Sequence, residues 1–284
     1  MRIGNDELKL KPVTFEGGSG GGVGGGVGGN KSRRRKKTRQ HKKQKKTAVR
    51  TLFLACEDVF STDDPETPLS PDKVAKIRSR LDVMKPEDLN LSPSLPYFGN
   101  PIHETHTNSA VTYIHLFESD HFSIGIFCLP AGSVIPLHNH PRMTVFSKLL
   151  FGSMHIKSYD WTVADDSKPH LEAPRSPLRL AKVKTNAVFT APCDTSILYP
   201  TTGGNMHCFT AMTPCAVIDV LGPPYSDYEG RHCAYYNPFP YIPAEVNNNK
   251  EKSVDEYALL QEIEKPDGFS VHGAIYNGPS IFHD

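Results

Sequence analysis

Two histidines separated by one residue are the feature of this chain best suited to chemistry. His138 and His140 lie in an apolar, β-prone run, PLHNHPRMTVFSKLLFG, which extends from Pro136 to Gly152. Successive side chains of a strand point to opposite faces of its sheet, so residues i and i+2 share one face. Two imidazoles on the inner face of a curved sheet would supply two of the three ligands of a facial metal site. The pattern therefore predicts a metal centre inside a barrel.

The residues around this pair resemble the first motif of the cupins, a superfamily of small barrels. That motif reads G-x5-H-x-H-x3-4-E-x6-G. Gly132 and Gly152 fall at the two glycine positions, but Val145 stands where the glutamate ligand is expected. Without that carboxylate, a bound divalent ion would keep its full charge. Such an ion favours an anionic substrate ligand, above all a thiolate.

His207 is the candidate for the third ligand. The second cupin motif places a histidine shortly after a glycine-containing turn, and His207 follows Gly204 by three positions, although Ala211 stands where asparagine is usual. Imidazole suits iron, zinc, copper and nickel alike, and three histidines with a bound water also suit hydrolytic zinc. The ligand set alone therefore leaves iron and zinc open.

The rest of the chain predicts a mainly β fold. Short β-branched and aromatic runs separated by turn residues are typical of an antiparallel barrel or jelly roll. We expect strands over residues 111–117, 122–128, 143–150, 153–159, 180–190, 207–212 and 215–221. Helices are expected over 48–60 and from an N-cap at Ser70 to a point before Pro86. A last helix over 253–264 is expected to precede a strand over 269–276. The predicted architecture is a cupin-type double-stranded β-helix with flanking helices.

The distribution of charge separates a basic tail from an acidic body. Residues 17–29 hold ten glycines, and residues 31–46 hold eleven of the 32 Lys and Arg residues and no acidic residue. We expect 1–46 to be a disordered tail whose basic run serves nuclear import. No aromatic residue lies within the run for base stacking, which disfavours sequence-specific nucleic-acid binding. We expect 47–284 to form a single domain with a helical lead-in over 47–100.

Composition also bounds the compartment. The six cysteines form no CxxC pair, which indicates reduced and partly buried thiols. The N-terminus lacks the apolar stretch of a signal peptide, and no apolar run is long enough to span a membrane. We therefore expect a protein located in the nucleus and cytoplasm, with no membrane association. Because antiparallel closure of a barrel needs no partner chain, we also expect a monomer.

Longer segments resemble the plant cysteine oxidases, which belong with the cysteamine-dioxygenase-like thiol dioxygenases. These segments are PLHNHPRMTVFSKLLFGSMHIKSYDW (136–161), GGNMHCFTA (203–211), DVLGPPYSDYEGRHCAYYNPFPY (219–241) and the closing GAIYNGPSI. The resemblance runs from about residue 50 to the C-terminus and excludes the glycine-rich and basic segments. It implies a non-haem enzyme with one Fe(2+) per chain, which uses O2 to oxidise the N-terminal cysteine of a protein to sulfinic acid. Its substrates would be transcription factors of the ethylene response type, group VII, and the enzyme would act as an oxygen sensor feeding the arginine N-degron pathway.

The same resemblance implies roles for particular residues. The iron ligands would be His138, His140 and His207. Asp219 and Tyr225 match acidic and phenolic positions of the active site. Asp219 would orient an imidazole or pair with the substrate ammonium, and Tyr225 would donate a hydrogen bond to bound oxygen. Cys233 and Tyr235 match a pair that is cross-linked in the animal relative, and the sequence leaves open whether that bond forms here.

Two other functions remain open at this stage. One is dioxygenation of a small thiol, cysteamine or free cysteine; the other is a metal-free binding cupin that acts as a nuclear interaction module. An enzyme for free cysteine needs a cation for the substrate carboxylate, and residues 86–141 contain no Lys or Arg. Arg142 or a later residue could still supply that charge. The pattern thus favours a peptide or cysteamine over free cysteine.

Overall fold

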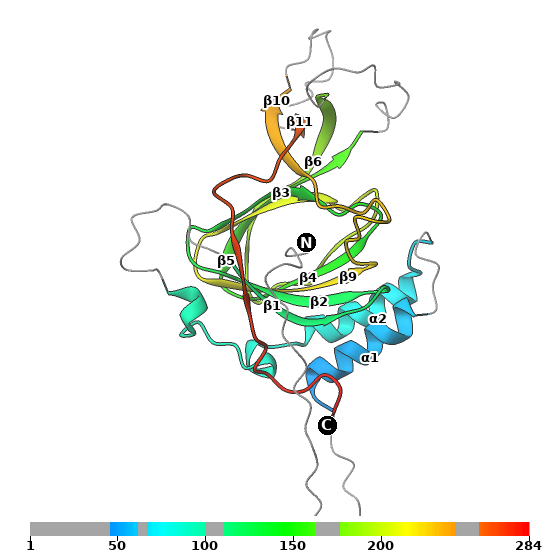
Figure 1. The fold of residues 1–284 in the computed structure, drawn as a ribbon, viewed down its shortest axis with the longest axis vertical. Helices are drawn as coiled ribbons and strands as arrows, with labels where there is room; N and C mark the ends of the chain where they lie inside the picture. The colour runs from blue at the N-terminus through cyan, green and yellow to red at the C-terminus, as the bar shows by residue number, and fades with distance from the viewer. Residues whose placement is uncertain (1–45, 62–66, 100–110, 163–176, 242–255, 284) are drawn as a thin grey trace, which may run out of the picture. The chain divides into compact units, whose positions relative to one another are not determined.

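Two β-sheets dominate the part of the chain that the structure describes (Figure 1). This computed structural model describes residues 46–61, 67–99, 111–162, 177–241 and 256–283. The predicted tail lies outside these residues apart from Lys46. The expected disorder of the tail and the domain boundary at residue 47 therefore stay predictions.

One sheet has six strands in the order β12-β1-β2-β9-β4-β7, and the other closes into a barrel in the order β10-β11-β6-β5-β8-β3. The first sheet consists of β1 (Val111–Glu118), β2 (Ser123–Leu129), β4 (Thr144–Phe151), β7 (Ser196–Leu198), β9 (Cys215–Gly222) and β12 (Val271–Ala274). The second consists of β3 (Val134–Asn139), β5 (Ser153–Trp161), β6 (Arg179–Thr190), β8 (Met206–Ala211), β10 (Tyr235–Pro240) and β11 (Tyr257–Ile263). The predicted mainly β barrel is confirmed.

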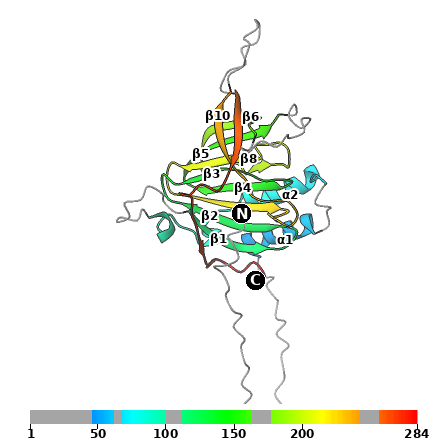
Figure 2. The same cartoon turned by 45° about the horizontal axis from the view of Figure 1, so that its top comes forward.

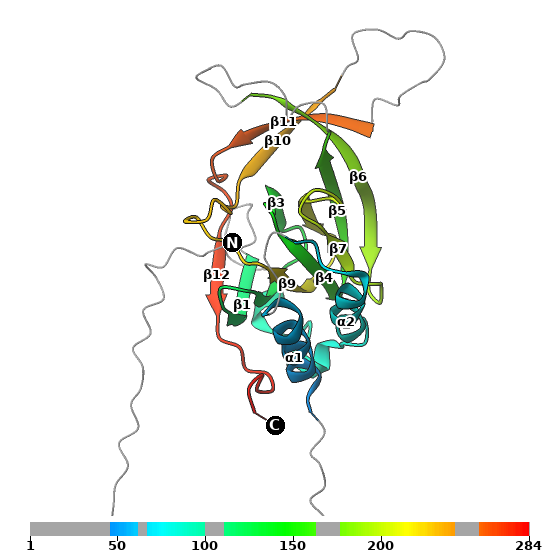
Figure 3. The same cartoon turned by 90° about the vertical axis from the view of Figure 1, so that its right-hand side faces the viewer.

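Two helices cover the outer face of the first sheet. They are α1 (Ala48–Phe60) and α2 (Pro71–Asp82), followed by short 3-10 turns at Pro86–Leu89 and Pro96–Phe98. Apolar side chains of α1 and α2, such as Leu52 and Ile77, join one core cluster with Ile124 of β2 and Ile218 of β9. The views in Figures 2 and 3 show β10 and β11 at the end of the barrel away from α1.

Local signals account for where these helices begin. The Ser70 hydroxyl accepts a hydrogen bond from the Lys73 amide at 3.4 Å, and Pro71 occupies the first helical position, as the sequence predicts. Thr47 caps α1 in the same way, through the amide of Arg50 at 3.3 Å. No helix in the described ranges has the length and apolar character needed to cross a membrane.

The helix predicted over 253–264 is wrong. Residues 253–255 lie outside the described part, and Tyr257–Ile263 forms strand β11. Ala, Leu, Glu and Gln give this segment a helical composition, but Ala258 and Leu260 alternate into the core while β11 pairs with β10 on one side and β6 on the other. Pairing within the barrel overrides the local preference. The strand expected over 269–276 is confirmed as β12.

The structure accounts for Gly152, the last glycine of the first cupin motif. It joins β4 to β5 with φ at +91°, a conformation that side chains disfavour. A Cβ at this position would also overlap the carbonyl oxygen of Pro214. Gly132 has φ at +81° as well, but a Cβ there would meet nothing within 4 Å. The turn after β4 therefore needs glycine for its backbone conformation and for space.

All six cysteines are free thiols. Burial is the main influence on each thiol and raises its pKa, to about 12 for Cys128, with the same direction for Cys56, Cys193, Cys208, Cys215 and Cys233. The thiols therefore stay protonated near neutral pH.

Candidate metal centre

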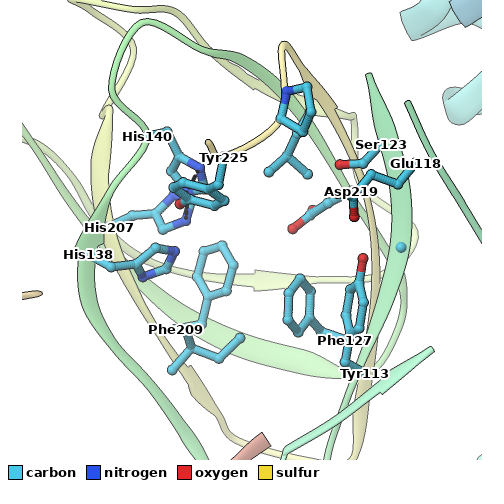
Figure 4. Close-up of a pocket in the computed structure, with 14 residues that line it drawn as sticks. Tyr113, Glu118, Ser123, Phe127, His138, His140, His207, Phe209, Asp219 and Tyr225 are labelled. Atoms are coloured by element: carbon cyan, nitrogen blue, oxygen red, sulfur yellow. Dashed lines mark hydrogen bonds between the residues drawn. The ribbon is translucent and has the colours of Figure 1, made fainter. Parts of the chain in front are cut away.

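Three histidine side chains converge inside the barrel (Figure 4). His138 on β3 lies directly opposite His207 on β8, and His140 follows β3 by one residue. One ring nitrogen from each histidine lies within 4.8 Å of the others, and the three side chains are buried. The structure thus brings together the three ligands that the sequence suggests.

The ring positions fit a single metal ion. Nε2 of His140 and Nε2 of His207 are 3.1 Å apart. Two imidazole nitrogens bound at right angles to one ion, each at about 2.0–2.1 Å, would be separated by about 3 Å. Burial lowers the pKa of His138 to about 4. Burial also lowers the pKa values of His140 and His207 well below the usual range, with the neighbouring imidazoles adding to the effect. Neutral rings with free lone pairs are the form that binds a metal.

Hydrogen bonds on the far side of two rings fix their orientation. Nδ1 of His138 donates to the carbonyl oxygen of Pro136 at 2.8 Å. Tyr225 donates to the carbonyl oxygen of Asn139 at 2.7 Å, so Nδ1 of His140 donates to the Tyr225 hydroxyl at 2.8 Å. Both contacts place the ring proton on Nδ1 and leave Nε2 for the metal. In this geometry Tyr225 acts on His140, and its own proton is already shared with Asn139.

Asn205 holds the backbone of His140, a contact that the sequence analysis missed. Its Oδ1 accepts from the His140 amide at 3.2 Å, and its Nδ2 donates to the His140 carbonyl at 2.7 Å and to that of Tyr199 at 2.9 Å. The Asn205 side chain is buried. Because His140 lies beyond the last residue of β3, sheet pairing alone does not position it. Asn205 supplies the missing constraint.

Asp160 on β5 in turn holds the turn that carries Asn205. Its carboxylate accepts from the amides of Gly203 at 3.1 Å, Gly204 at 2.8 Å and Asn205 at 3.0 Å. This turn leads directly into β8 and His207. One carboxylate therefore orders the segment that positions the second and third ligands.

Val145, at the position where cupins carry glutamate, has an apolar side chain with no donor atom for a metal ion. It is fully buried in an apolar cluster with Met143, Leu198, Leu221 and Tyr225. The cluster supports the Tyr225 ring, which in turn contacts His140. At this position the site therefore has an apolar side chain that packs against Tyr225, where the cupin motif has a charged glutamate.

A cavity of about 40 Å³ lies between the histidines and the opposite wall. A water molecule needs about 10–15 Å³ by the same measure, so the cavity admits groups of a few atoms. Its lining consists of Tyr113, Glu118, Ser123, Gly125, Phe127, Ile135, His138, His140, His207, Phe209, Asp219, Leu221, Pro224 and Tyr225. No Lys or Arg is among these described lining residues. The cavity wall therefore offers no cationic side chain to the carboxylate of a substrate such as free cysteine.

Asp219 on β9 faces the histidines from the opposite wall (Figure 4). The residue is 5% exposed, and its Oδ1 has no hydrogen-bond partner among the described residues. Burial raises the pKa of this carboxyl to about 7, an effect that the Ser147 hydroxyl on β4 only partly offsets. A buried carboxyl with one unpartnered oxygen, directed into a cavity, is suited to a cationic ligand group.

Cys233 lies beside both phenols of the site. Its thiol interacts with the hydroxyls of Tyr225 and Tyr235, and it contributes to the raised pKa of each phenol after burial, the main cause. Tyr235 on β10 pairs directly with His138. The structure therefore brings Cys233 and Tyr235 next to the metal centre.

We expect Asn205→Ala to weaken binding of a divalent ion by roughly 10- to 100-fold, because partners that orient metal ligands have effects of this size. Equilibrium dialysis with Co²⁺ or Fe²⁺ would measure the change. Asn186→Ala is the matched control, since Asn186 is exposed on β6 and bonds only to His155 among the contacts described. Wild-type affinity in Asn205→Ala would contradict the role given to this side chain.

We expect Asp219→Asn to change how stability depends on pH in chelator-treated protein. The unfolded carboxyl ionises near pH 3.9, whereas the folded carboxyl keeps its proton up to about pH 7. Unfolding therefore releases a proton between these values, and wild-type stability falls as pH rises from 4 to 7. The asparagine variant lacks this loss, which amounts to at most about 4 kcal/mol. Urea unfolding of both proteins at pH 4.5 and pH 8 would measure the free energy of unfolding. If wild type and Asp219→Asn differ in this free energy by the same amount at both pH values, the raised pKa is refuted.

Comparison with known proteins agrees with this geometry. The PCO_ADO family model matches residues 81–281. Plant cysteine oxidase 1 and plant cysteine oxidase 2 of Arabidopsis thaliana are 53% and 51% identical to this chain, over 83% and 82% of its length and 80% and 83% of their own. The 2-aminoethanethiol dioxygenase of Homo sapiens is 32% identical over 77% of this chain and 86% of its own. The match covers the closed barrel and all three histidines of the metal centre, and this chain belongs to the PCO_ADO family as a thiol dioxygenase.

Proposed function

We propose that this enzyme oxidises the N-terminal cysteine of a protein to cysteine sulfinic acid, with O2 as co-substrate and one Fe(2+) held by His138, His140 and His207. One observation carries the proposal. The cavity has three neutral imidazoles on one wall, a buried carboxyl with one unpartnered oxygen on the other, and no Lys or Arg among its described lining residues.

The two walls match the two reactive groups of an N-terminal cysteine. Its thiol fits the histidine wall, where the ligand set brings no negative charge of its own. Its α-ammonium fits the carboxylate of Asp219, which lies opposite within the same cavity. The carboxyl group of a peptide cysteine is an amide, so it needs no cation. Free cysteine would bring a carboxylate into a cavity that offers it no positive side chain.

The protein supplies positions and the metal supplies the redox chemistry. Iron(II), held by His138, His140 and His207, would supply the redox chemistry between the substrate thiol and dioxygen. Asn205 and Tyr225 keep His140 in place, and Asp219 holds the ammonium of the substrate and thereby orients its thiol. The apolar rings of Phe127 and Phe209, which also line the cavity, limit the access of water.

The relatives favour cysteine over 2-aminoethanethiol as the substrate. The two cysteine oxidases are 51–53% identical to this chain, compared with 32% for the human 2-aminoethanethiol dioxygenase.

We further propose that the physiological substrates are transcription factors of the ethylene response type and that the enzyme acts as an oxygen sensor in the arginine N-degron pathway. Oxidation of 2-aminoethanethiol is the second candidate function, because that amine also lacks a carboxylate and fits the same cavity.

We expect iron(II)-loaded protein to add two oxygen atoms to a Cys-initiated peptide in air, since the site can hold the thiol next to the metal. Mass spectrometry would measure the mass gain, and fragmentation of the peptide would show whether both oxygen atoms are on the cysteine sulfur. His207→Ala should lower the rate at least 100-fold and also reduce metal content, which plasma emission spectrometry would report.

Competition between the peptide and 2-aminoethanethiol in one reaction decides between the two substrates. A higher kcat/KM for the peptide supports the proposal. Oxidation of 2-aminoethanethiol alone would refute the proposal and support the second candidate function. Oxidation of neither compound by protein that retains iron would refute both functions.

We also propose that the enzyme is a monomer found in nucleus and cytoplasm, with residues 31–46 contacting the nuclear import machinery. Deletion of 31–46 from a fluorescent fusion should lower the nuclear-to-cytoplasmic ratio, because the deleted segment holds eleven basic residues. Deletion of the uncharged segment 17–29 is the control. An unchanged ratio after removal of 31–46 would overturn the import role.

A further inference from the structure

Gly125 makes room for the ring of Tyr113 in the cavity wall opposite the histidines. Gly125 on β2 pairs directly with Asp219 on β9. A Cβ on Gly125 would overlap the hydroxyl group and ring of Tyr113, so this hydroxyl occupies the place that a side chain on Gly125 would fill. Directly opposite residues of an antiparallel pair have Cβ atoms about 4.5–5.5 Å apart. The Tyr113 hydroxyl is therefore a close neighbour of the Asp219 side chain.

The Tyr113 hydroxyl is available to the cavity as a hydrogen-bond donor. Tyr113 and Phe127 both line the cavity, with ring centroids 5.0 Å apart, and the Tyr113 hydroxyl is directed toward Asp219 (Figure 4). Burial is the main cause that raises the pKa of this phenol, and the carboxyl groups of Glu118 and Asp219 add to the effect. The hydroxyl therefore keeps its proton well above neutral pH.

Three hydroxyl groups are among the described residues that line the cavity. That of Tyr225 lies beside the histidines and already donates its proton to the carbonyl oxygen of Asn139. The other two belong to Tyr113 and Ser123, on the opposite wall (Figure 4). Since no Lys or Arg is among the described lining residues, these two hydroxyls are the donors that this wall can offer to a neutral acceptor beside a bound ammonium.

We propose that Tyr113 is a specificity-determining residue whose hydroxyl donates a hydrogen bond to the first peptide carbonyl of the substrate. The inference rests on the proposed function. The ammonium and this carbonyl are both bonded to the α-carbon of an N-terminal cysteine, so the carbonyl oxygen lies within about 4 Å of the ammonium nitrogen. With the ammonium at Asp219, the carbonyl therefore lies near the neighbouring Tyr113 hydroxyl, whatever path the later residues take.

This hydrogen bond separates the two candidate substrates by their chemistry. A cysteine that begins a peptide has the carbonyl, whereas 2-aminoethanethiol has none. A site with a donor placed for a substrate group disfavours the analogue that lacks this group, because the donor then loses its partner. For one bond between uncharged groups, the expected effect on kcat/KM is roughly three- to tenfold. The substrate class is therefore cysteine whose carboxyl group forms an amide.

The test compares two Cys-initiated peptides that differ by one atom, with oxygen or sulfur in the first carbonyl. Sulfur is the weaker hydrogen-bond acceptor. Both peptides compete in one reaction with iron-loaded wild-type protein, Tyr113→Phe, Ser123→Ala or Tyr97→Phe, and mass spectrometry gives the ratio of their kcat/KM values. Tyr97→Phe is the matched control, because Tyr97 packs against the core cluster of the helices and does not line the cavity. Ratios are taken within each protein, so changes in overall activity cancel.

We expect wild type, Ser123→Ala and Tyr97→Phe to favour the oxygen peptide by roughly three- to tenfold. The ratio should approach one in Tyr113→Phe, through a lower kcat/KM for the oxygen peptide. Gly125→Ala should have the same effect, because the added Cβ displaces the Tyr113 ring. This variant keeps the proposal testable where Tyr113→Phe yields no folded protein.

A ratio near one in wild type, or an unchanged ratio in Tyr113→Phe, overturns the role of Tyr113 while leaving the proposed function intact. Loss of the preference in Ser123→Ala with its retention in Tyr113→Phe overturns it too, since Ser123 would then be the donor. Failure of wild type to oxidise either peptide, with 2-aminoethanethiol still oxidised, refutes the proposed function itself and this inference with it.

Discussion

The pairing of β3 with β8 is the interaction on which the metal centre depends. It sets His138 directly opposite His207, after a register shift that follows Ile135. Because strand side chains alternate between faces, a slip of one residue would turn His207 away from the barrel interior. The closed ring of strands resists such a slip, since β3 is also joined to β10 and β8 to β5. Only His140 lies beyond this pairing, and Asn205 and Tyr225 hold it.

The charge arrangement of the site follows from where its carboxylates lie. Val145 removes the acid from the ligand set, while Asp219 and Glu118 occupy the wall across the cavity. Under the proposed function, a substrate with a thiol and an ammonium group would fit between a metal ion held by the histidines and these acids. The same arrangement would disfavour molecules that carry a carboxylate beside the thiol, because no Lys or Arg is among the described lining residues. Selectivity would then arise from separating positive and negative charge across a narrow space.

Local patterns in the sequence predict much of this molecule, and contacts between distant residues account for what they miss. The spacing of His138 and His140 and the cap at the start of α2 involve neighbours in the chain, and the sequence alone predicts them. Asn205 lies 65 residues from the His140 backbone that it binds, so no motif reveals its role. Strand β11 has a helical composition that barrel pairing overrides. Strand β10 contains Pro238 and Pro240, which argue against a strand, but both lie where β10 pairs with β11 alone.

The six protonated thiols have a consequence for an enzyme that handles sulfur and oxygen together. Oxidants attack thiolates far more readily than thiols, and attack also requires access. Burial raises the pKa of every cysteine in this chain, including Cys233 beside the metal centre. Cys56, Cys128 and Cys215 are also buried, so these three sulfur atoms lack both the charge and the access that oxidation requires. The packing that stabilises the barrel therefore sets these thiols apart from a substrate thiol that enters the cavity.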